Sequence, residues 1–190
     1  MEILTKSIMR VFTVLIGIWI VFIPFKGRCS DEDKEYLVKA AFLYNFAKFV
    51  HWPETAFRSP DEPVLLCILG TSPFGNALKT IEKSEVIPER NLSVKLCKNI
   101  GEVSGCHMLF ISSSESENLS SILSAIQTMP MLTVSDSKGF AQRGVMINLV
   151  RIDNKMRFEI NTEAVNKMPF TLSSNLLKLA IIVNPAFSKE

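Results

Sequence analysis

Four short apolar runs in the middle of the chain constrain its fold more than any other feature. Each is of strand length, and they occupy residues 63–70, 92–97, 107–111 and 131–134. The first run is apolar enough to be buried on both faces of a sheet, as strands of parallel sheets are. Segments with helical patterns, 72–83 and 114–127, alternate with the runs. This β-α-β-β-α-β order predicts a largely parallel sheet flanked by helices, in the α/β class.

The last third of the chain predicts a β-hairpin that joins this sheet. Residues 145–152 and 155–160 have strand patterns and flank Asp153-Asn154, a pair typical of a two-residue hairpin turn. A chain of 190 residues is long enough for one compact domain with a sizeable core, so a single domain is expected. Two further helices are expected at 162–167 and 173–182.

A helix is predicted over residues 34–50, ending before Trp52-Pro53. At 100° per residue its apolar positions form two stripes on roughly opposite sides. One stripe comprises Tyr36, Ala40, Leu43, Ala47 and Val50, and the other comprises Val38 and the Phe stripe, Phe42, Phe46 and Phe49. Two interpretations stay open. Either the sheet and the helix at 173–182 sandwich this helix, or the Phe stripe is a dimer or partner surface, because aromatic residues are enriched at interface cores.

The N-terminal segment has the form of a secretory signal peptide. Lys6 and Arg10 precede an apolar run over residues 11–25, which is shorter than the roughly 20 residues of a membrane-spanning helix. We therefore predict that residues 1–29 are a cleaved signal peptide and that residues 30–190 form the exported domain. An uncleaved N-terminal anchor is the alternative.

The basic character of the chain belongs largely to this N-terminal segment. The whole chain carries +2, but residues 1–29 alone hold four basic residues against Glu2, a net +3, so the exported part carries about −1. No Lys/Arg cluster remains there, which excludes nucleic acid as a partner.

Three cysteines remain in the exported part, Cys67, Cys97 and Cys106. In an oxidising compartment two of them are expected to pair, and the sequence allows all three pairings. Their spacing contains no CxxC motif, and neither His51 nor His107 completes a four-ligand set. We therefore predict no metal site and no cofactor.

The best candidate for an anion site is the strand-to-helix turn GTSPFG, residues 70–75. Free N–H groups at Ser72, Phe74 and Gly75, at the start of the predicted helix, would face the anion. The turn lacks the Gly-Lys-Ser/Thr ending of a phosphate-binding loop, so an ordinary helix cap at Ser72 is the alternative. His51 has no nucleophile or carboxylate at a motif spacing, and we do not expect an enzyme.

Three separated blocks of the sequence resemble the YfiR-type family of periplasmic proteins. The blocks are KAAFLYNFAKFVHWP, LLCILGTSPFG and GFAQRGVMINLVRIDNKMRFEINTEAVNKMPFTLSSNLLKLA, which together span about residues 34–182. The resemblance implies a periplasmic regulator that restrains an inner-membrane diguanylate cyclase by binding its periplasmic part. It also implies sequestration of the regulator by an outer-membrane lipoprotein. A homodimer is expected.

The resemblance further implies a structural disulfide between Cys67 and Cys106. The family's regulator has a second cysteine pair, whereas residues 141–149 contain no cysteine. Redox control through that second bridge is not expected here, and Cys97 is an unmatched thiol.

A second hypothesis is a small-ligand sensor that acts in the periplasm. Its ligand would lie beyond the carboxyl ends of the parallel strands, near Gly70 and the loops at 112–116 and 135–139. The chain lacks the two large lobes usual in solute-capturing proteins, which favours the regulator.

Overall fold

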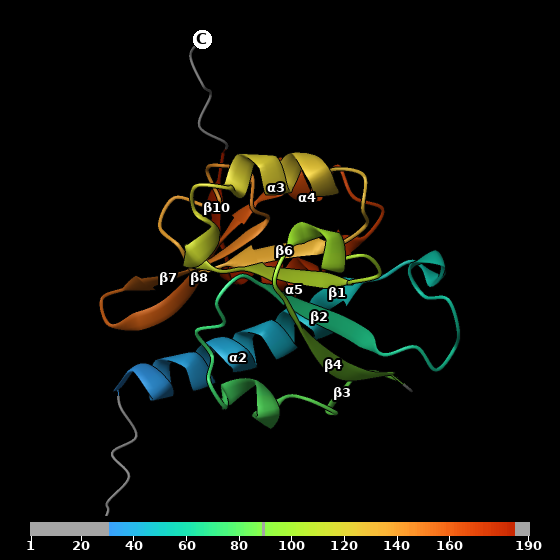
Figure 1. Ribbon diagram of the computed structural model, residues 1–190. Coiled ribbons are helices and arrows are strands. Elements are labelled where there is room, and N and C mark those ends of the chain that lie inside the picture. Colours follow the sequence, from blue (N-terminus) through green and yellow to red (C-terminus); the bar gives the residue numbers. More distant parts are fainter. Residues whose placement is uncertain (1–30, 89, 185–190) are drawn as a thin grey trace, which may run out of the picture. The chain divides into compact units, whose positions relative to one another are not determined.

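The computed structural model describes residues 31–88 and 90–184. They belong to one compact unit of the chain, Asp31–Glu190, drawn in Figure 1. The predicted signal peptide, residues 1–29, lies outside the described residues. Within the described ranges, no helix is long and apolar enough to cross a membrane.

The described domain is built on an eight-stranded sheet with the order β10-β8-β7-β6-β5-β2-β4-β3. The neighbouring strands β4, β2, β5, β6 and β7 pair with one another in parallel. At the two sides of this parallel part, β3 is antiparallel to β4 and β8 is antiparallel to β7. The last strand, β10, runs parallel to β8. The predicted α/β fold with a largely parallel sheet is confirmed. The strands are β2 (Val64–Leu69), β3 (Glu85–Ile87), β4 (Arg90–Cys97), β5 (Met108–Ile111), β6 (Leu132–Ser135), β7 (Ile147–Ile152), β8 (Lys155–Asn161) and β10 (Ile181–Val183).

Burial on both faces distinguishes the central strands. Every residue of β5 and β6 is buried, and so is all of β2 except one half-buried position. Strand order reverses at β2, because β4 is added on one side of it and β5, β6 and β7 on the other. A reversal of this kind opens a crevice beyond the carboxyl ends of the strands.

Helices cover both faces of the sheet (Figure 1). The long helix α2 (Asp31–Phe49) crosses one face, and α3 (Leu119–Ile126) covers the other. The core is divided accordingly into a cluster around Leu43 and Phe110 on the α2 side and one around Leu109 and Ile122 on the α3 side. The remaining elements are α4 (Thr162–Val165), α5 (Ser174–Leu179), the 3-10 turns η1 (Glu54–Ala56), η2 (Ala77–Thr80), η3 (Ile100–Glu102) and η4 (Ser113–Glu115), and a small sheet of β1 (Val50–His51) with β9 (Thr171–Leu172).

The predicted C-terminal hairpin is present as β7 and β8. Asp153 and Asn154 have φ angles of +48° and +58°, as both central residues of a type I′ turn must. Ile152 and Lys155 form the closing pair of the ladder. The hairpin joins the sheet through β7, which pairs with β6.

The predicted helix over residues 72–83 is wrong. Gly75 has a φ of +50°, and only the four-residue 3-10 turn η2 follows it. A left-handed residue so close to the expected start ends any helix there, because α-helical residues need φ near −60°. The Gly75-Asn76 pair is the turn signal that outweighs Pro73.

Two other predicted helices are shorter than expected. In the segment 173–182, α5 ends at Leu179 and the chain becomes extended to form β10. In the segment 114–127, the α-helix begins only at Leu119, after the 3-10 turn η4.

Candidate functional site

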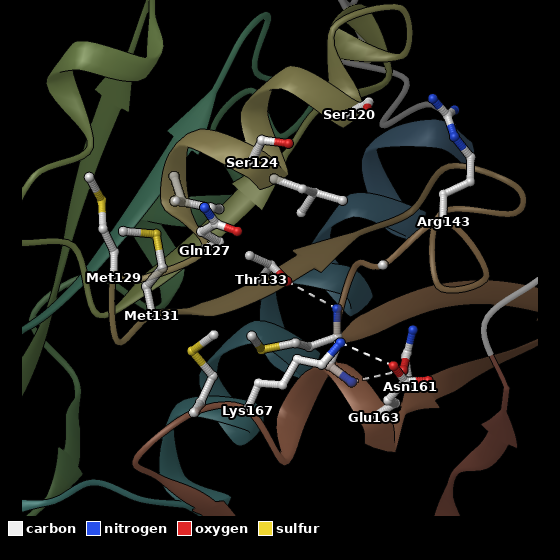
Figure 2. Close-up of a pocket in the computed structure, with 16 residues that line it drawn as sticks. Ser120, Ser124, Gln127, Met129, Met131, Thr133, Arg143, Asn161, Glu163 and Lys167 are labelled. Atoms are coloured by element: carbon white, nitrogen blue, oxygen red, sulfur yellow. Dashed lines mark hydrogen bonds and ion pairs between the residues drawn. The ribbon is translucent and has the colours of Figure 1, made fainter. Parts of the chain in front are cut away.

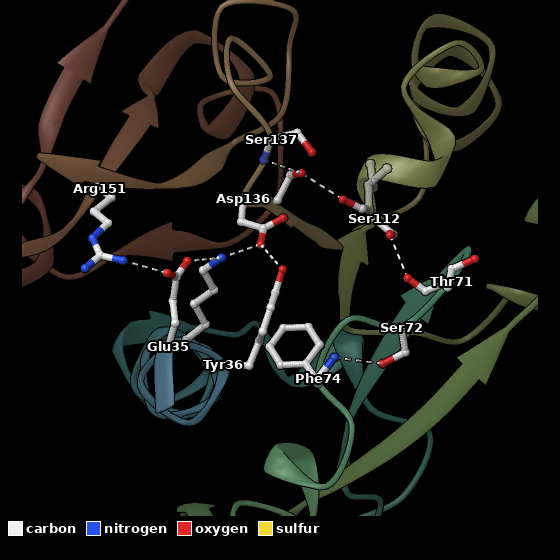
Figure 3. Close-up of polar contacts among 12 residues, drawn as sticks. Glu35, Tyr36, Thr71, Ser72, Phe74, Ser112, Asp136, Ser137 and Arg151 are labelled. Carbon is white, nitrogen blue, oxygen red and sulfur yellow. Dashed lines mark hydrogen bonds and ion pairs between the residues drawn. The ribbon is translucent and has the colours of Figure 1, made fainter. Parts of the chain in front are cut away.

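Serine hydroxyls tie together the three loops at the carboxyl ends of β2, β5 and β6. Ser112 Oγ donates a 2.7 Å hydrogen bond to the Thr71 carbonyl, and Ser114 Oγ accepts one of 2.9 Å from the Thr71 N–H. Ser135 Oγ donates to the Ile111 carbonyl at 2.7 Å and accepts from the Ser137 N–H. Figure 3 shows Ser112 and Thr71 facing each other across this junction. The segment after Gly70 and the loops at 112–116 and 135–139, where the sequence predicted a ligand, therefore lie next to one another.

Gly70 is required where β2 meets this junction. Its φ is +86°, a conformation that side-chain-bearing residues rarely adopt. A Cβ at this position would also lie 2.8 Å from Glu115 Oε1 and would collide with the Ser114 hydroxyl. The close approach of the β2 and β5 loops thus depends on the absence of a side chain here.

A network of charged side chains lies at the same end of the sheet, between α2 and the strands (Figure 3). Lys39 Nζ lies 2.7 Å from Asp136 Oδ2 and 2.8 Å from Glu35 Oε1. Tyr36 donates a 3.2 Å hydrogen bond to the same Asp136 oxygen, and Arg151 pairs with Glu35 at 3.0 Å. We call these five residues the α2 ion network. Spacings of three and four residues place the three α2 members on one face of the helix.

Burial and charge pairing shift the pKa values of Lys39 and Glu35 in opposite directions. Burial opposes the charge on Lys39, but its hydrogen bonds to Asp136 and Glu35 outweigh burial and raise the Lys39 pKa. The hydrogen bond from Lys39 lowers the pKa of Glu35. Burial, followed by the nearby Asp136 charge, raises the pKa of Tyr36. Lys39 and Glu35 are therefore charged at neutral pH and Tyr36 is neutral.

Two open cavities flank the Lys39–Asp136 pair. The first, of about 500 Å³, is lined by Tyr36, Lys39, Ser113, Ser116, Asp136, Ser137, Lys138, Phe140 and Arg143. The second, of about 560 Å³, lies between α2, the 138–142 loop and the hairpin, and shares Lys39, Asp136 and Lys138 with the first. Ser137 Oγ is buried, and no hydrogen-bond partner for it occurs among the described residues. Hydroxyls, two aromatic rings and both signs of charge suit a small polar or zwitterionic molecule.

The predicted anion site around residues 72–75 does not form around a helix end. Ser72 Oγ accepts a hydrogen bond from the Phe74 N–H, and Gly75 lies in the turn before η2. Phe74 is buried and packs edge-on against Tyr36 and Phe110. Without an α-helix the segment lacks the dipole on which the prediction depended.

A third cavity lies between α3 and α4, and sequence reasoning missed it. It has a volume of about 330 Å³ and is lined by four methionines, Met129, Met131, Met146 and Met168, together with polar groups such as Thr133 and Asn161. Figure 2 shows that the polar side chains of α3 stand on one wall and Lys167, paired with Glu163, on another. The four methionines are spread over residues 129–168, so no local sequence pattern predicts the cavity.

The cysteines lie on the α3 side of the sheet. Cys67 of β2 and Cys106 before β5 form a disulfide with Cα atoms 6.0 Å apart, the pair that the family resemblance implies. Cys97, at the end of β4, is a buried free thiol whose Sγ lies 3.6 Å from the Glu102 carbonyl. Burial raises the pKa of the Cys97 thiol.

His107 is held by two backbone groups. Its Nδ1 accepts a hydrogen bond from the Leu65 N–H at 3.0 Å, so Nε2 carries the proton and donates to the Ala56 carbonyl at 3.0 Å. Phe57 stacks on the ring at 4.6 Å. Burial lowers the His107 pKa, so the ring is neutral in the folded protein. Both ring nitrogens are occupied, which fits a structural role.

The Phe stripe does not form one surface. Phe46 is fully buried and packs edge-on against Phe158, with ring centroids 5.3 Å apart. Phe42 is half-buried against the same ring, and only Phe49 is exposed, at 38%. Phe46 therefore belongs to the sheet-facing side of α2, and α5 lies beside the end of the helix, where the Ser173 N–H donates to the Phe49 carbonyl. The role of Phe42 and Phe49 in binding a partner stays a prediction.

The exposed side of α2 carries other apolar residues. Leu37 and Val38 are 41% and 46% exposed. Val38 and hairpin residues including Met156 line a common groove. We call Leu37 and Val38 the α2 outer patch.

Comparison with known proteins places the chain in a family and a fold. A family model described as YfiR/HmsC-like matches residues 36–181, and no curated protein matches the chain. Two solved structures with TM-scores of 0.51 are similar in fold at 9% identity. One is the ABC domain from Streptococcus pneumonia in complex with L-Trp, and the other is a conserved domain protein from Vibrio cholerae. The matches cover 78% and 77% of this chain but only 60% and 59% of theirs.

Proposed function

The chain belongs to the YfiR/HmsC-like family, and on this ground we propose that it is a periplasmic regulatory protein that restrains an inner-membrane diguanylate cyclase. It acts by binding the periplasmic part of the cyclase and catalyses no reaction itself. The family match over residues 36–181 is the observation that carries this proposal, because it spans nearly the whole described domain. The disulfide between Cys67 and Cys106 is consistent with an oxidising compartment.

The α2 outer patch is the surface that we assign to the cyclase. Its two residues are apolar and exposed, whereas Leu43 and Phe46 of the same helix are buried in the core. Arg151 and Lys34 border the groove beside Val38, so the patch has the apolar centre and charged rim of a protein interface. Phe49 extends the same exposed side toward the end of the helix. We further propose that the protein forms a homodimer and that an outer-membrane lipoprotein sequesters it, which frees the cyclase.

Affinity purification from solubilised membranes tests the proposal. The tagged wild-type protein is expected to recover an inner-membrane diguanylate cyclase, and its deletion is expected to raise cellular cyclic di-GMP. Val38→Glu should abolish recovery without a change in thermal stability, because the side chain is 46% exposed. Leu96→Glu is the matched control, since Leu96 of β4 is 63% exposed and does not belong to the α2 outer patch. Absence of any cyclase together with unchanged cyclic di-GMP would refute the regulator.

The cavity beside Asp136 favours a second candidate function, a periplasmic sensor of a small ligand. Its volume of about 500 Å³ and its position beyond the strand ends support this alternative. The similar domain from Streptococcus pneumonia was determined with L-Trp, and amino acids are the first ligands to test. Native mass spectrometry of protein isolated from the periplasm would reveal a retained molecule. Ser137→Leu, which fills the cavity, should then release it.

A further inference from the structure

Three cysteine sulfurs come together on the α3 side of the sheet. The Sγ atoms of Cys67, Cys97 and Cys106 all lie within 4.8 Å of one another. The three residues are 0%, 1% and 6% exposed. Cys67 comes from β2, Cys97 from the end of β4, and Cys106 from the turn before β5. The spacing of the cysteines in the sequence argued against a metal site. In the sheet, however, β2 lies between β4 and β5, and this strand order brings together sulfurs that are far apart in the chain.

Strand register explains why Cys97 does not form a disulfide with Cys67. Cys97 pairs with Leu69, two residues beyond Cys67 on β2. Strands about 4.8 Å apart, with a rise of about 3.3 Å per residue, put the Cα atoms of Cys67 and Cys97 roughly 8 Å apart. A disulfide spans at most about 7 Å between Cα atoms. A bond between Cys67 and Cys97 would therefore require the backbone to move.

A metal ion imposes a looser requirement on the same three residues. With metal–sulfur bonds of about 2.3 Å, sulfurs that share one ion lie roughly 4 Å apart. The sulfurs of this cluster already lie within 4.8 Å, so small side-chain adjustments suffice once the disulfide is opened. The apolar side chains of Val103, Leu109 and Ile111 belong to the same core cluster and keep water away.

We propose that the reduced protein binds one copper(I) ion through the thiolates of Cys67, Cys97 and Cys106. Thiolates are soft ligands that favour copper(I), and three of them satisfy this ion. Zinc requires four ligands, and within 31–88 and 90–184 no fourth His, Cys, Asp or Glu joins the group. The disulfide and the copper site are thus mutually exclusive states of one cluster.

A dithiol is the reductant that opens the Cys67–Cys106 disulfide. The dithiol supplies two electrons and two protons to the Cys67–Cys106 bond, which becomes two thiols, and the dithiol itself becomes a disulfide. Copper(I) then displaces the three thiol protons and keeps its oxidation state. Copper binding is therefore expected to release protons and to block reformation of the disulfide.

The test is a titration under nitrogen. Protein reduced with dithiothreitol, then freed of it by gel filtration, is titrated with the copper(I)–bicinchoninate complex, and loss of the coloured complex is followed. One copper per chain is expected, with sulfur-only coordination by X-ray absorption. Oxidised wild-type protein and reduced Cys97→Ser should lose this stoichiometric binding. The Cys97→Ser variant keeps the disulfide pair, so its circular dichroism after oxidation verifies its fold.

Three results would overturn the copper site. The first is equal copper binding by reduced wild-type protein and reduced Cys97→Ser, because Cys97 would then not be a ligand. The second is no binding by reduced wild-type protein that retains its circular dichroism spectrum. The third is loss of that spectrum on reduction, since the site exists only in the folded sheet.

Discussion

Lys39 of α2 and Asp136 at the end of β6 form an ion pair of 2.7 Å in which both side chains are more than nine-tenths buried. The two residues are 97 positions apart in the chain, so the pair fastens the first long helix to the carboxyl end of the sheet. Glu35 and Tyr36 add contacts to Lys39 and Asp136. Buried charges are tolerated only when they are paired in this way.

Removing one member of this pair should be costly. Lys39→Met leaves the Asp136 carboxylate buried without its cation, and we expect a loss of about 3 kcal/mol in the free energy of unfolding. Urea denaturation measures the loss. The double variant Lys39→Met, Asp136→Asn should recover much of it, because the uncompensated charge is gone.

Lys34→Met is the matched control for Lys39→Met. Lys34 pairs with Asp31 in the first turns of the same helix, but both side chains are largely exposed. Its loss should change stability by less than about 1 kcal/mol. Equal effects of the two substitutions would contradict the assignment of the buried pair as the stronger contact.

His107 should make the fold sensitive to mild acid. Burial lowers its folded-state pKa below the ordinary value of 6.5, so the unfolded chain binds the proton first as the pH falls. Stability is unaffected above about pH 6.5 and declines below it, by up to about 1.4 kcal/mol per pH unit, until the folded pKa is reached. Urea midpoints at several pH values measure the decline. His107→Gln should flatten this pH dependence.

The disulfide should contribute substantially to stability. Cys67 and Cys106 are 39 residues apart, and closing a loop of this size is worth roughly 3 to 4 kcal/mol in the chain-entropy model. Cys67→Ala with Cys106→Ala should therefore lose about this amount in urea denaturation without reductant. Dithiothreitol should destabilise wild-type protein similarly and leave the double variant unaffected. Unchanged stability of the double variant would show that the bond does not constrain the unfolded chain.

The members of the Phe stripe should differ in their contributions to stability. Phe46→Ala opens a cavity beside Phe158 and should cost about 3 to 5 kcal/mol. Phe49→Ala, at a side chain 38% exposed, should cost less than about 1 kcal/mol. Thermal and urea unfolding of the two variants provide the comparison. A folded and stable Phe46→Ala protein would mean that the core does not depend on this ring.

Local sequence patterns predicted the elements whose residues decide their own conformation. The apolar run 63–70 and the Asp153-Asn154 turn needed no tertiary information to be recognised. The strand β10 did. Ile181 and Ile182 follow a well-capped helix, and only the free edge of β8 gives these β-branched residues a strand partner. The prediction of one helix through 182 failed for that reason.

The candidate sites were harder to predict than the fold. Topology alone indicated that the loops at 112–116 and 135–139 meet near Gly70, since carboxyl ends of parallel strands share one edge. The partnership of Lys39 with Asp136 has no local signal, because the two lie on a helix and a strand that are distant in the chain. The same holds for Cys97, whose distance from the other sulfurs depends on strand register.

Helix α2 is fastened near its middle and at its C-terminal end. The Lys39–Asp136 pair holds the middle, and pairing of Val50 with Leu172 follows directly after the last residue of the helix. A helix anchored twice cannot swing about one end, and packed elements shift between discrete arrangements instead of bending gradually. A partner that displaces α2 must therefore release both attachments together. The response of this domain to such a partner is expected to be all-or-none.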